Sequence, residues 1–224
     1  MKIVAYDAGR ATLLLPLEEV LPLDGYDSRE VLDNITDRYN FSTGPDYSMP
    51  REKLQKAGFN FELGTFIFNG KAIEIGRLSV FSDGVVAVSA KTDYAEALID
   101  DLMAWLQADM GFRSPLRPTR KLFLSNVVFD LEIGVEGLIK KHSEMANLLG
   151  KVASKYFPNA PVPRLSRIDI DFDPEDHQSS IQMPGLVIER RGGVPFEQER
   201  YFSSAPLRTH EHEAVLESIE KLMR

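Results

Sequence analysis

Hydrophobic and polar positions alternate along the first half of the chain in a pattern typical of strands and helices. A period of two predicts strands at 11–17, 59–68, 71–81 and 85–90. Asn69-Gly70 and the turn at 82–84 separate the last three of these runs, which predicts tight hairpins. Apolar residues three and four positions apart predict helices at 28–40 and 93–110.

The second half repeats this order of elements. A strand is predicted at 120–132 and a helix at 136–157. Three strands at about 164–173, 182–190 and 194–203 precede a final helix at 209–223. Each half therefore contains a strand, a helix, three strands and a helix, although the two halves show no convincing residue-level identity.

We expect an α+β fold built from two pseudo-repeated β-α-β-β-β-α halves, residues 1–112 and 113–224, that form one compact unit. Hairpin-connected strands favour a largely antiparallel sheet. We expect the helices to pack mainly on one face of this sheet.

Three predicted strands, 11–17, 59–68 and 120–131, are apolar on both sides, which a sheet covered on one face does not require. Strict alternation in 59–68 places Phe59, Phe61, Leu63 and Ile67 on one side and Phe66 and Phe68 on the other. The strand at 120–131 has the same property. Three explanations stay open: helices cover both faces, the second face binds another copy or another protein, or it forms a groove for an apolar ligand or peptide. The predicted interface residues are Phe66, Phe68, Phe123 and Phe129.

Composition narrows the possible functions. The chain has no cysteine, which excludes disulfides, thiolate zinc sites and cysteine nucleophiles. It shows no signal peptide and no apolar run of the roughly 20 residues that span a bilayer. We therefore expect a soluble, cytoplasmic protein with no membrane partner.

Charge argues against a nucleic-acid partner. The formal net charge is −8, and only residues 113–155 are basic, with 8 basic and 4 acidic residues. Phosphate neutralisation supplies most nonspecific nucleic-acid affinity, so this distribution favours a solvated face over a nucleic-acid interface.

The most acidic stretch, 167–178, contains Asp169, Asp171 and Asp173 in alternation with apolar residues, as in a half-exposed strand. A calcium EF-hand loop requires glycine and glutamate where this chain has Pro174 and Ser180.

An alternative interpretation is a metal-dependent hydrolase or nuclease. It would use Asp169, Asp171 and Glu189, with Arg191 at the position where such nucleases have a lysine. Arginine remains protonated and cannot shuttle a proton, which weakens this alternative.

The remaining polar motifs have structural explanations. Asp93 with Glu96 predicts a capping box, and Thr209 predicts an N-cap. His210 and His212 point in different directions on a helix and cannot share a metal ion there. His142 lies on the apolar side of its helix, where a core histidine is expected.

No nucleophile, phosphate-binding or dinucleotide motif occurs in the sequence. We therefore expect a non-catalytic protein-interaction module without a cofactor. It would either associate with itself or serve as an accessory subunit of a larger complex. The alternatives are the metal-dependent hydrolase or nuclease and a groove for an apolar ligand.

Overall fold

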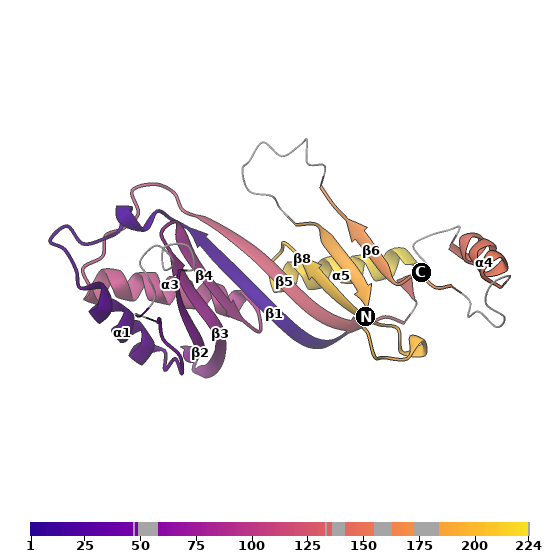
Figure 1. Ribbon diagram of the computed structural model, residues 1–224, viewed down its shortest axis with the longest axis horizontal. Helices are drawn as coiled ribbons and strands as arrows, with labels where there is room; N and C mark the ends of the chain where they lie inside the picture. The colour runs from indigo at the N-terminus through magenta and orange to yellow at the C-terminus, as the bar shows by residue number, and fades with distance from the viewer. Residues whose placement is uncertain are drawn as a thin grey trace. The chain divides into compact units, whose positions relative to one another are not determined.

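A computed structural model describes residues 1–46, 48, 58–132, 134–135, 142–154, 163–172 and 184–223. Within these ranges the chain forms four α-helices and eight strands, so the α+β class is confirmed (Figure 1). The strands are β1 (Lys2–Leu14), β2 (Phe59–Phe68), β3 (Lys71–Phe81), β4 (Gly84–Ser89), β5 (Arg120–Asp130), β6 (Arg167–Ile170), β7 (Leu186–Arg190) and β8 (Arg200–Ala205). The helices are α1 (Ser28–Arg38), α3 (Thr92–Asp109), α4 (His142–Ala153) and α5 (Thr209–Met223).

The strands are hydrogen-bonded in the order β2-β3-β4-β1-β5-β8-β7-β6. The pairs β1–β4, β2–β3, β3–β4, β6–β7 and β7–β8 are antiparallel. For β2–β3 and β3–β4 the short hairpin turns require this direction. Helices and strands follow one another in the predicted order in both halves. A repeat relationship between 1–112 and 113–224 stays a prediction.

The chain folds into two compact units that share two strands. The first unit comprises 1–5, 126–205 and 210–224, and the second comprises 6–125 and 206–209. Both β1 and β5 contribute residues to each unit. The units are described separately below.

In the second unit, α1 and α3 pack side by side on one face of the strands. Buried cross-strand pairs such as Leu13–Val85 and Ala11–Ala87 form the floor of this core. Asp101 of α3 joins the two helices by accepting hydrogen bonds from Arg38, at 3.1 Å, and from the Tyr39 hydroxyl, at 2.7 Å. Burial, together with the hydrogen bond to Asp101, raises the pKa of Tyr39.

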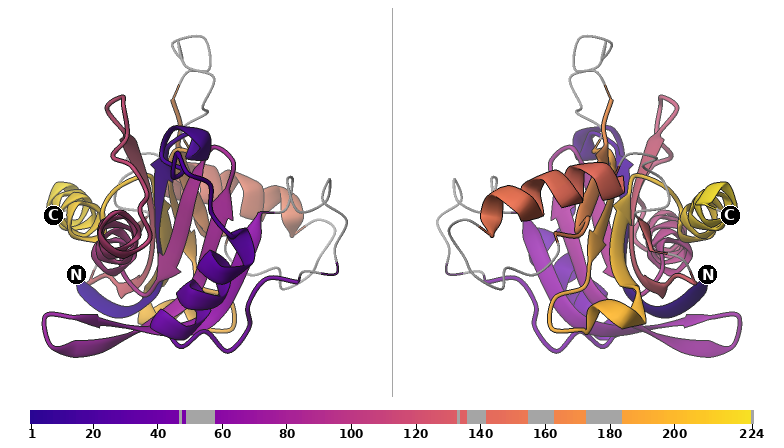
Figure 2. Two further views of the ribbon diagram at one scale, coloured as in Figure 1. Left: turned by 90° about the vertical axis from the view of Figure 1, so that its left-hand side faces the viewer. Right: turned by 90° about the vertical axis from the view of Figure 1, so that its right-hand side faces the viewer.

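In the β2–β3 hairpin the alternation of buried and exposed positions shifts by one residue, at Leu63 in β2 and at Gly76 in β3. We call this the phase shift. Leu63 has φ of 55°, in the left-handed region, and β3 has an irregularity between Ile75 and Arg77 relative to β4. Beyond this point the buried positions of both strands shift by one residue. Figure 2 shows the hairpin as a long twisted ribbon (purple) whose turn projects away from the neighbouring strands.

This phase shift corrects the predicted orientation of the phenylalanines. Phe66 is only 9% exposed and lies against Tyr39, which also contacts Phe41 in the same core. Phe61 contacts Phe41 as well, so Phe61 and Phe66 share one face. Strict alternation placed them on opposite faces because it did not include the irregularity.

In the first unit, three consecutive residues of β5 are buried. Val127, Val128 and Phe129 are 0%, 6% and 1% exposed, and neighbouring residues of a strand point to opposite faces. Both faces of β5 are therefore covered at this level. The ring of Phe129 packs against Tyr201 of β8, with ring centroids 5.9 Å apart.

Burial assigns two predicted interface residues to the core. Phe66 and Phe129 lie inside the chain rather than on a surface open to a partner. Phe68 and Phe123 are half-buried and pack against the core of the second unit. Any partner contact by Phe68 or Phe123 stays a prediction.

Candidate functional site

A groove in the second unit begins where β4 ends. β4 lies between β3 and β1, and its last residue, Ser89, is opposite both Ile75 and Gly9. Beyond this level both neighbours continue, β3 with residues 71–74 and β1 with residues 6–8. Among the described residues no strand lies between β3 and β1 beyond Ser89, so the sheet has a gap at this level.

Backbone groups of β3 point into this gap. Phe68 and Lys71 flank the two-residue turn at 69–70 and form the hydrogen-bonded pair that closes the hairpin. Peptide groups alternate along a strand, so Ala72 and Glu74 direct their N–H and C=O groups away from β2 and toward the gap. The Ser89 hydroxyl confirms this direction, because it donates a 2.7 Å hydrogen bond to the Glu74 carbonyl oxygen.

The groove has a volume of about 700 Å³, within the range of ligand-binding clefts. The residues that line the groove include two acidic ones, Asp7 on β1 and Glu74 on β3, and neither has an ion-pair partner among the described residues. Tyr6 and Tyr94 supply aromatic surface, and the Lys91 ammonium lies 3.9 Å from the centre of the Tyr6 ring. The lining therefore combines two carboxylates with apolar contact area, and one ammonium group lies beside it.

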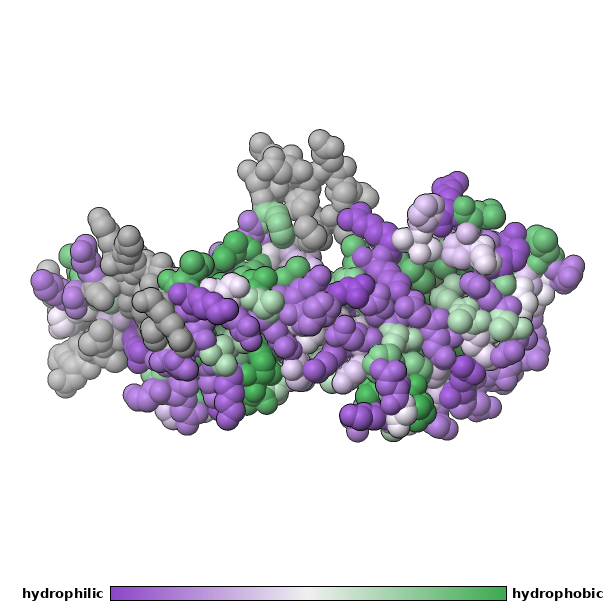
Figure 3. Space-filling view, turned by 180° about the vertical axis from the view of Figure 1, so that it is seen from behind, coloured by the Kyte–Doolittle hydropathy of each residue, from purple (hydrophilic) through white to green (hydrophobic). Residues whose placement is uncertain are grey.

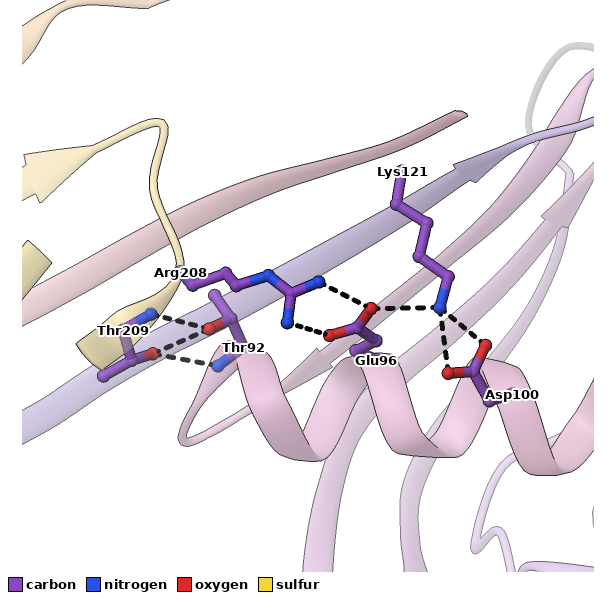
Figure 4. Close-up of polar contacts among 6 residues, drawn as sticks. All are labelled: Thr92, Glu96, Asp100, Lys121, Arg208 and Thr209. Atoms are coloured by element: carbon purple, nitrogen blue, oxygen red, sulfur yellow. Dashed lines mark hydrogen bonds and ion pairs between the residues drawn. The ribbon is translucent and has the colours of Figure 1, made fainter. Parts of the chain in front are cut away.

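The start of α3, between the groove-lining residues Ala90 and Tyr94, is held by a reciprocal pair of threonines. The Thr209 hydroxyl accepts a 3.0 Å hydrogen bond from the Thr92 N–H, and the Thr92 hydroxyl accepts one of 2.7 Å from the Thr209 N–H (Figure 4). Thr92 begins α3, and the predicted capping box of Asp93 and Glu96 is wrong because the N-cap residue is Lys91, which makes no side-chain cap hydrogen bond. Thr209 therefore caps α3, a helix distant in sequence.

Ion pairs extend this anchor along α3. Glu96 accepts hydrogen bonds from Arg208, at 2.9 Å, and from Lys121, at 3.0 Å (Figure 4). Lys121 also donates to both carboxylate oxygens of Asp100, at 2.7 and 2.8 Å. Partial burial lowers the pKa of Lys121, but its bonds to Asp100 and Glu96 outweigh this effect and raise the pKa overall. The first turns of α3, and with them Tyr94, are therefore fixed before any ligand binds.

The carboxylates predicted for a metal site do not converge in the first unit. Arg167 lies between two of them, 2.9 Å from Asp169 and 3.2 Å from Glu189. The hydrogen bond to Asp169 raises the pKa of Arg167. Asp171 accepts a hydrogen bond from the Phe172 backbone N–H. No group of three metal-ligating side chains occurs among the described residues, and Asp173, Pro174 and Ser180 lie outside them.

A buried serine and histidine lie close together in the same unit without forming a catalytic pair. The Ser203 hydroxyl donates a 2.7 Å hydrogen bond to the Val187 carbonyl, so it accepts at 2.9 Å from His212 Nε2. A base must instead accept the proton of its nucleophile. Both side chains are fully buried, so this pair joins α5 to β8. His210 is exposed, and the side chain of His142 lies outside the described part.

The second unit also contains a small apolar cavity between α1, α3 and the strands. Its volume is about 70 Å³, and apolar side chains provide almost its entire surface. Tyr26 and Phe112, in edge-to-face contact with centroids 5.9 Å apart, lie at this cavity.

Sequence periodicity gave no indication of the groove. Its walls are defined by which strands are neighbours and by where β4 ends relative to β1 and β3. Glu74 and Ser89 are ordinary strand residues in the sequence, and Asp7 precedes the strand predicted at 11–17. The predicted strand 71–81 is already longer than the predicted strand 85–90, but the extension of β1 to Lys2, which completes the groove, was not predicted.

Comparisons with known proteins add no functional assignment. No protein-family model matches the chain, and no curated protein matches its sequence. None of the described helices is long and apolar enough to cross a membrane. On the face shown in Figure 3, hydrophobic residues reach the surface in separate patches among hydrophilic ones.

Proposed function

We propose that this chain is a non-catalytic protein-interaction module that binds an extended segment of another protein in the groove beyond β4. The bound segment would continue the line of β4 and pair with β3 on one side and β1 on the other. The observation that carries the proposal is the end of β4 at Ser89, while both neighbouring strands continue. Strand addition of this kind draws its affinity from main-chain hydrogen bonds.

The chemistry of the walls specifies the segment. Asp7 and Glu74 favour a segment that carries a lysine or arginine, since two acidic groups face the same groove. Tyr6 and Tyr94 provide contact area for an apolar neighbour of that basic residue. Because α3 is anchored at Thr92, binding does not have to order the helix that carries Tyr94.

A peptide selection tests the proposal. Random peptides displayed on phage are selected on the full chain, and binding of the enriched peptides is measured by titration calorimetry. Ala72→Pro removes the N–H that faces the groove, whereas Ala72→Val at the same exposed position keeps it. We expect Ala72→Pro to weaken binding about tenfold, the equivalent of one hydrogen bond of about 1.4 kcal/mol, and Ala72→Val to change it by less than about twofold.

Charge supplies a second criterion for the same selection. Enriched peptides are expected to carry a basic residue. Asp7→Asn or Glu74→Gln should weaken the binding of these peptides and reduce its dependence on salt. Equal binding by Ala72→Pro and Ala72→Val, with no preference for basic peptides, would show that the groove does not accept a strand.

A second candidate function is the binding of a small apolar molecule in the cavity between α1 and α3. The observation in its favour is the nearly complete apolar lining of about 70 Å³. A dry cavity of about 150 Å³ holds benzene, so this space admits only a smaller group such as a short alkyl chain. Xenon titration followed by methyl NMR tests it: shifts should be confined to lining residues such as Val31 and Leu102, and their absence would reject the site.

A further inference from the structure

Helix α4 presents its large apolar side chains to solvent. Met145, Leu148, Leu149 and Val152 are 63%, 65%, 58% and 53% exposed. Their spacing of three and four residues places them in one stripe along the helix. A stripe of this width normally faces a core.

The same helix buries its small residues instead. Ala146 is only 8% exposed. Gly150, one turn further along, is half-buried, and a methyl group placed on it would lie 3.6 Å from the ring of Pro163. Burial of Met145, Leu148, Leu149 and Val152 would stabilise the helix far more than burial of alanine and glycine. The stripe is therefore arranged for contact with something outside the described chain.

We infer that the stripe binds the same stripe of a second copy of this chain, as an antiparallel helix pair around a two-fold axis. The four apolar residues are symmetric about a point between Leu148 and Leu149. In an antiparallel pair centred there, Met145 of one copy lies opposite Val152 of the other, and each leucine lies opposite a leucine. Every large apolar side chain of the stripe then has an apolar partner.

Charge complementarity favours this partner over others. Glu144 and Lys151 are exposed and seven residues apart, so they lie on the same flank of the stripe. A two-fold antiparallel pair places this flank beside the same flank of the partner, with the sequence running in the opposite direction. Glu144 of each copy therefore lies near Lys151 of the other. A parallel pair would not bring Glu144 near Lys151.

The small area that two α4 helices can bury determines how strongly two copies of the chain should associate. A helix of 12 residues is about 18 Å long, so the pair alone buries less than the 1,200–2,000 Å² typical of a stable interface. We therefore expect a reversible dimer whose fraction rises with concentration rather than a permanent one.

Analytical ultracentrifugation of the full chain tests the inference over an about hundredfold range of concentration. Leu148→Glu should abolish the dimer, whereas Leu222→Glu, at a leucine that is 79% exposed on α5, should not. Because both leucines are exposed, neither substitution should alter the fold, which circular dichroism verifies.

Charge reversal distinguishes the antiparallel pair from other arrangements. Glu144→Lys and Lys151→Glu each create like-charge contacts and should weaken the dimer about tenfold, while the double variant Glu144→Lys/Lys151→Glu should restore it. A monomer at every concentration would overturn the inference, as would a dimer that neither reversal affects. Binding of a monomer to anionic phospholipid vesicles, lost in Leu148→Glu, would also overturn it and assign the stripe to a lipid surface.

Discussion

The phase shift in the β2–β3 hairpin can be tested by comparing two neighbouring residues of β2, Phe66 and Ile67. Alternation continued from Phe59 and Phe61 would bury Ile67 and expose Phe66. The structure has the reverse, with Phe66 9% and Ile67 63% exposed. Truncation of each side chain to alanine measures which one lies in the core.

The expected cost follows from these exposures. Removal of a buried phenylalanine side chain destabilises a protein by about 3–5 kcal/mol, and the contacts of Phe66 with Tyr39 and Phe68 place Phe66→Ala in that range. Ile67 has little of its side chain covered, so Ile67→Ala should cost less than about 1 kcal/mol. The difference of about 3 kcal/mol is well above the error of the measurement.

Urea unfolding followed by tryptophan fluorescence is the appropriate assay. Trp105, the single tryptophan, lies on α3 and packs against the core that contains Phe66, so its signal reports on this unit. With a urea slope of about 2 kcal/mol per M, Phe66→Ala should lower the midpoint by about 2 M and Ile67→Ala by less than about 0.5 M.

Equal destabilisation by the two substitutions, or a larger effect of Ile67→Ala, would refute the phase shift. Such a result would restore regular alternation and return Phe66 to the surface, where the predicted interface placed it. A change in the urea slope rather than in the midpoint would indicate that the substitution altered the compactness of the denatured or the native state. Leu63→Gly would then serve as a second test of the phase shift. Glycine adopts the φ of 55° at residue 63 without steric cost, so Leu63→Gly should not destabilise the shifted hairpin.

Three further predictions concern packing, capping and acid stability. Gly64→Ala should destabilise the second unit by about 1–3 kcal/mol in the same urea assay, because the added methyl group would lie 2.6 Å from the Phe41 ring. Thr209→Val should cost about 1–3 kcal/mol by thermal unfolding, because it leaves the buried N–H of Thr92 without its acceptor, and an unchanged midpoint would contradict the capping role. The hydrogen bond from Arg200 lowers the pKa of Asp130, so the stabilisation is present above the usual aspartate pKa of about 3.9 and is lost as the pH falls through the lower folded-state value. Asp130→Asn should therefore be less stable than the natural chain at pH 7, and the difference in stability should shrink as the pH falls below about 3.9. A difference that does not change with pH would exclude this linkage.

Local signals in the sequence located most elements but not all of their bounds. β1 is Lys2–Leu14 rather than 11–17, and the strand predicted at 194–203 is a short 3-10 helix, Phe196–Gln198, followed by β8. The 93–110 prediction matches α3, Thr92–Asp109, and the Asn69-Gly70 turn closes the β2–β3 hairpin as expected. The phase shift could not be predicted, because leucine is not a residue type that indicates a left-handed φ, and Leu63 adopts it only in the folded context.

Hydrophobic periodicity also could not predict contacts between residues that are distant in the sequence, because it describes only neighbouring positions. Thr209 carries the signal of an N-cap, but its hydroxyl caps α3, which lies 117 residues earlier. The groove depends on the strand order, which a list of elements does not specify. Asp169 on β6 is exposed as predicted, but Ile170 and Phe172 are 56% and 46% exposed, so the expectation of a covered apolar side is wrong at these residues. The ion pair between Arg167 and Glu189 depends on the register with β7, which the sequence does not specify.

The division of the chain into units also has a consequence for the order of folding during synthesis. Almost all of the second unit, 6–125, is a continuous stretch, whereas the first unit combines residues 1–5 with 126–205 and 210–224. A nascent chain can therefore assemble the second unit while the first still lacks most of its residues. The contact between Thr92 and Thr209 forms only after residue 209 has been synthesised, so the start of α3 gains this anchor late, when the strands that line the groove already exist.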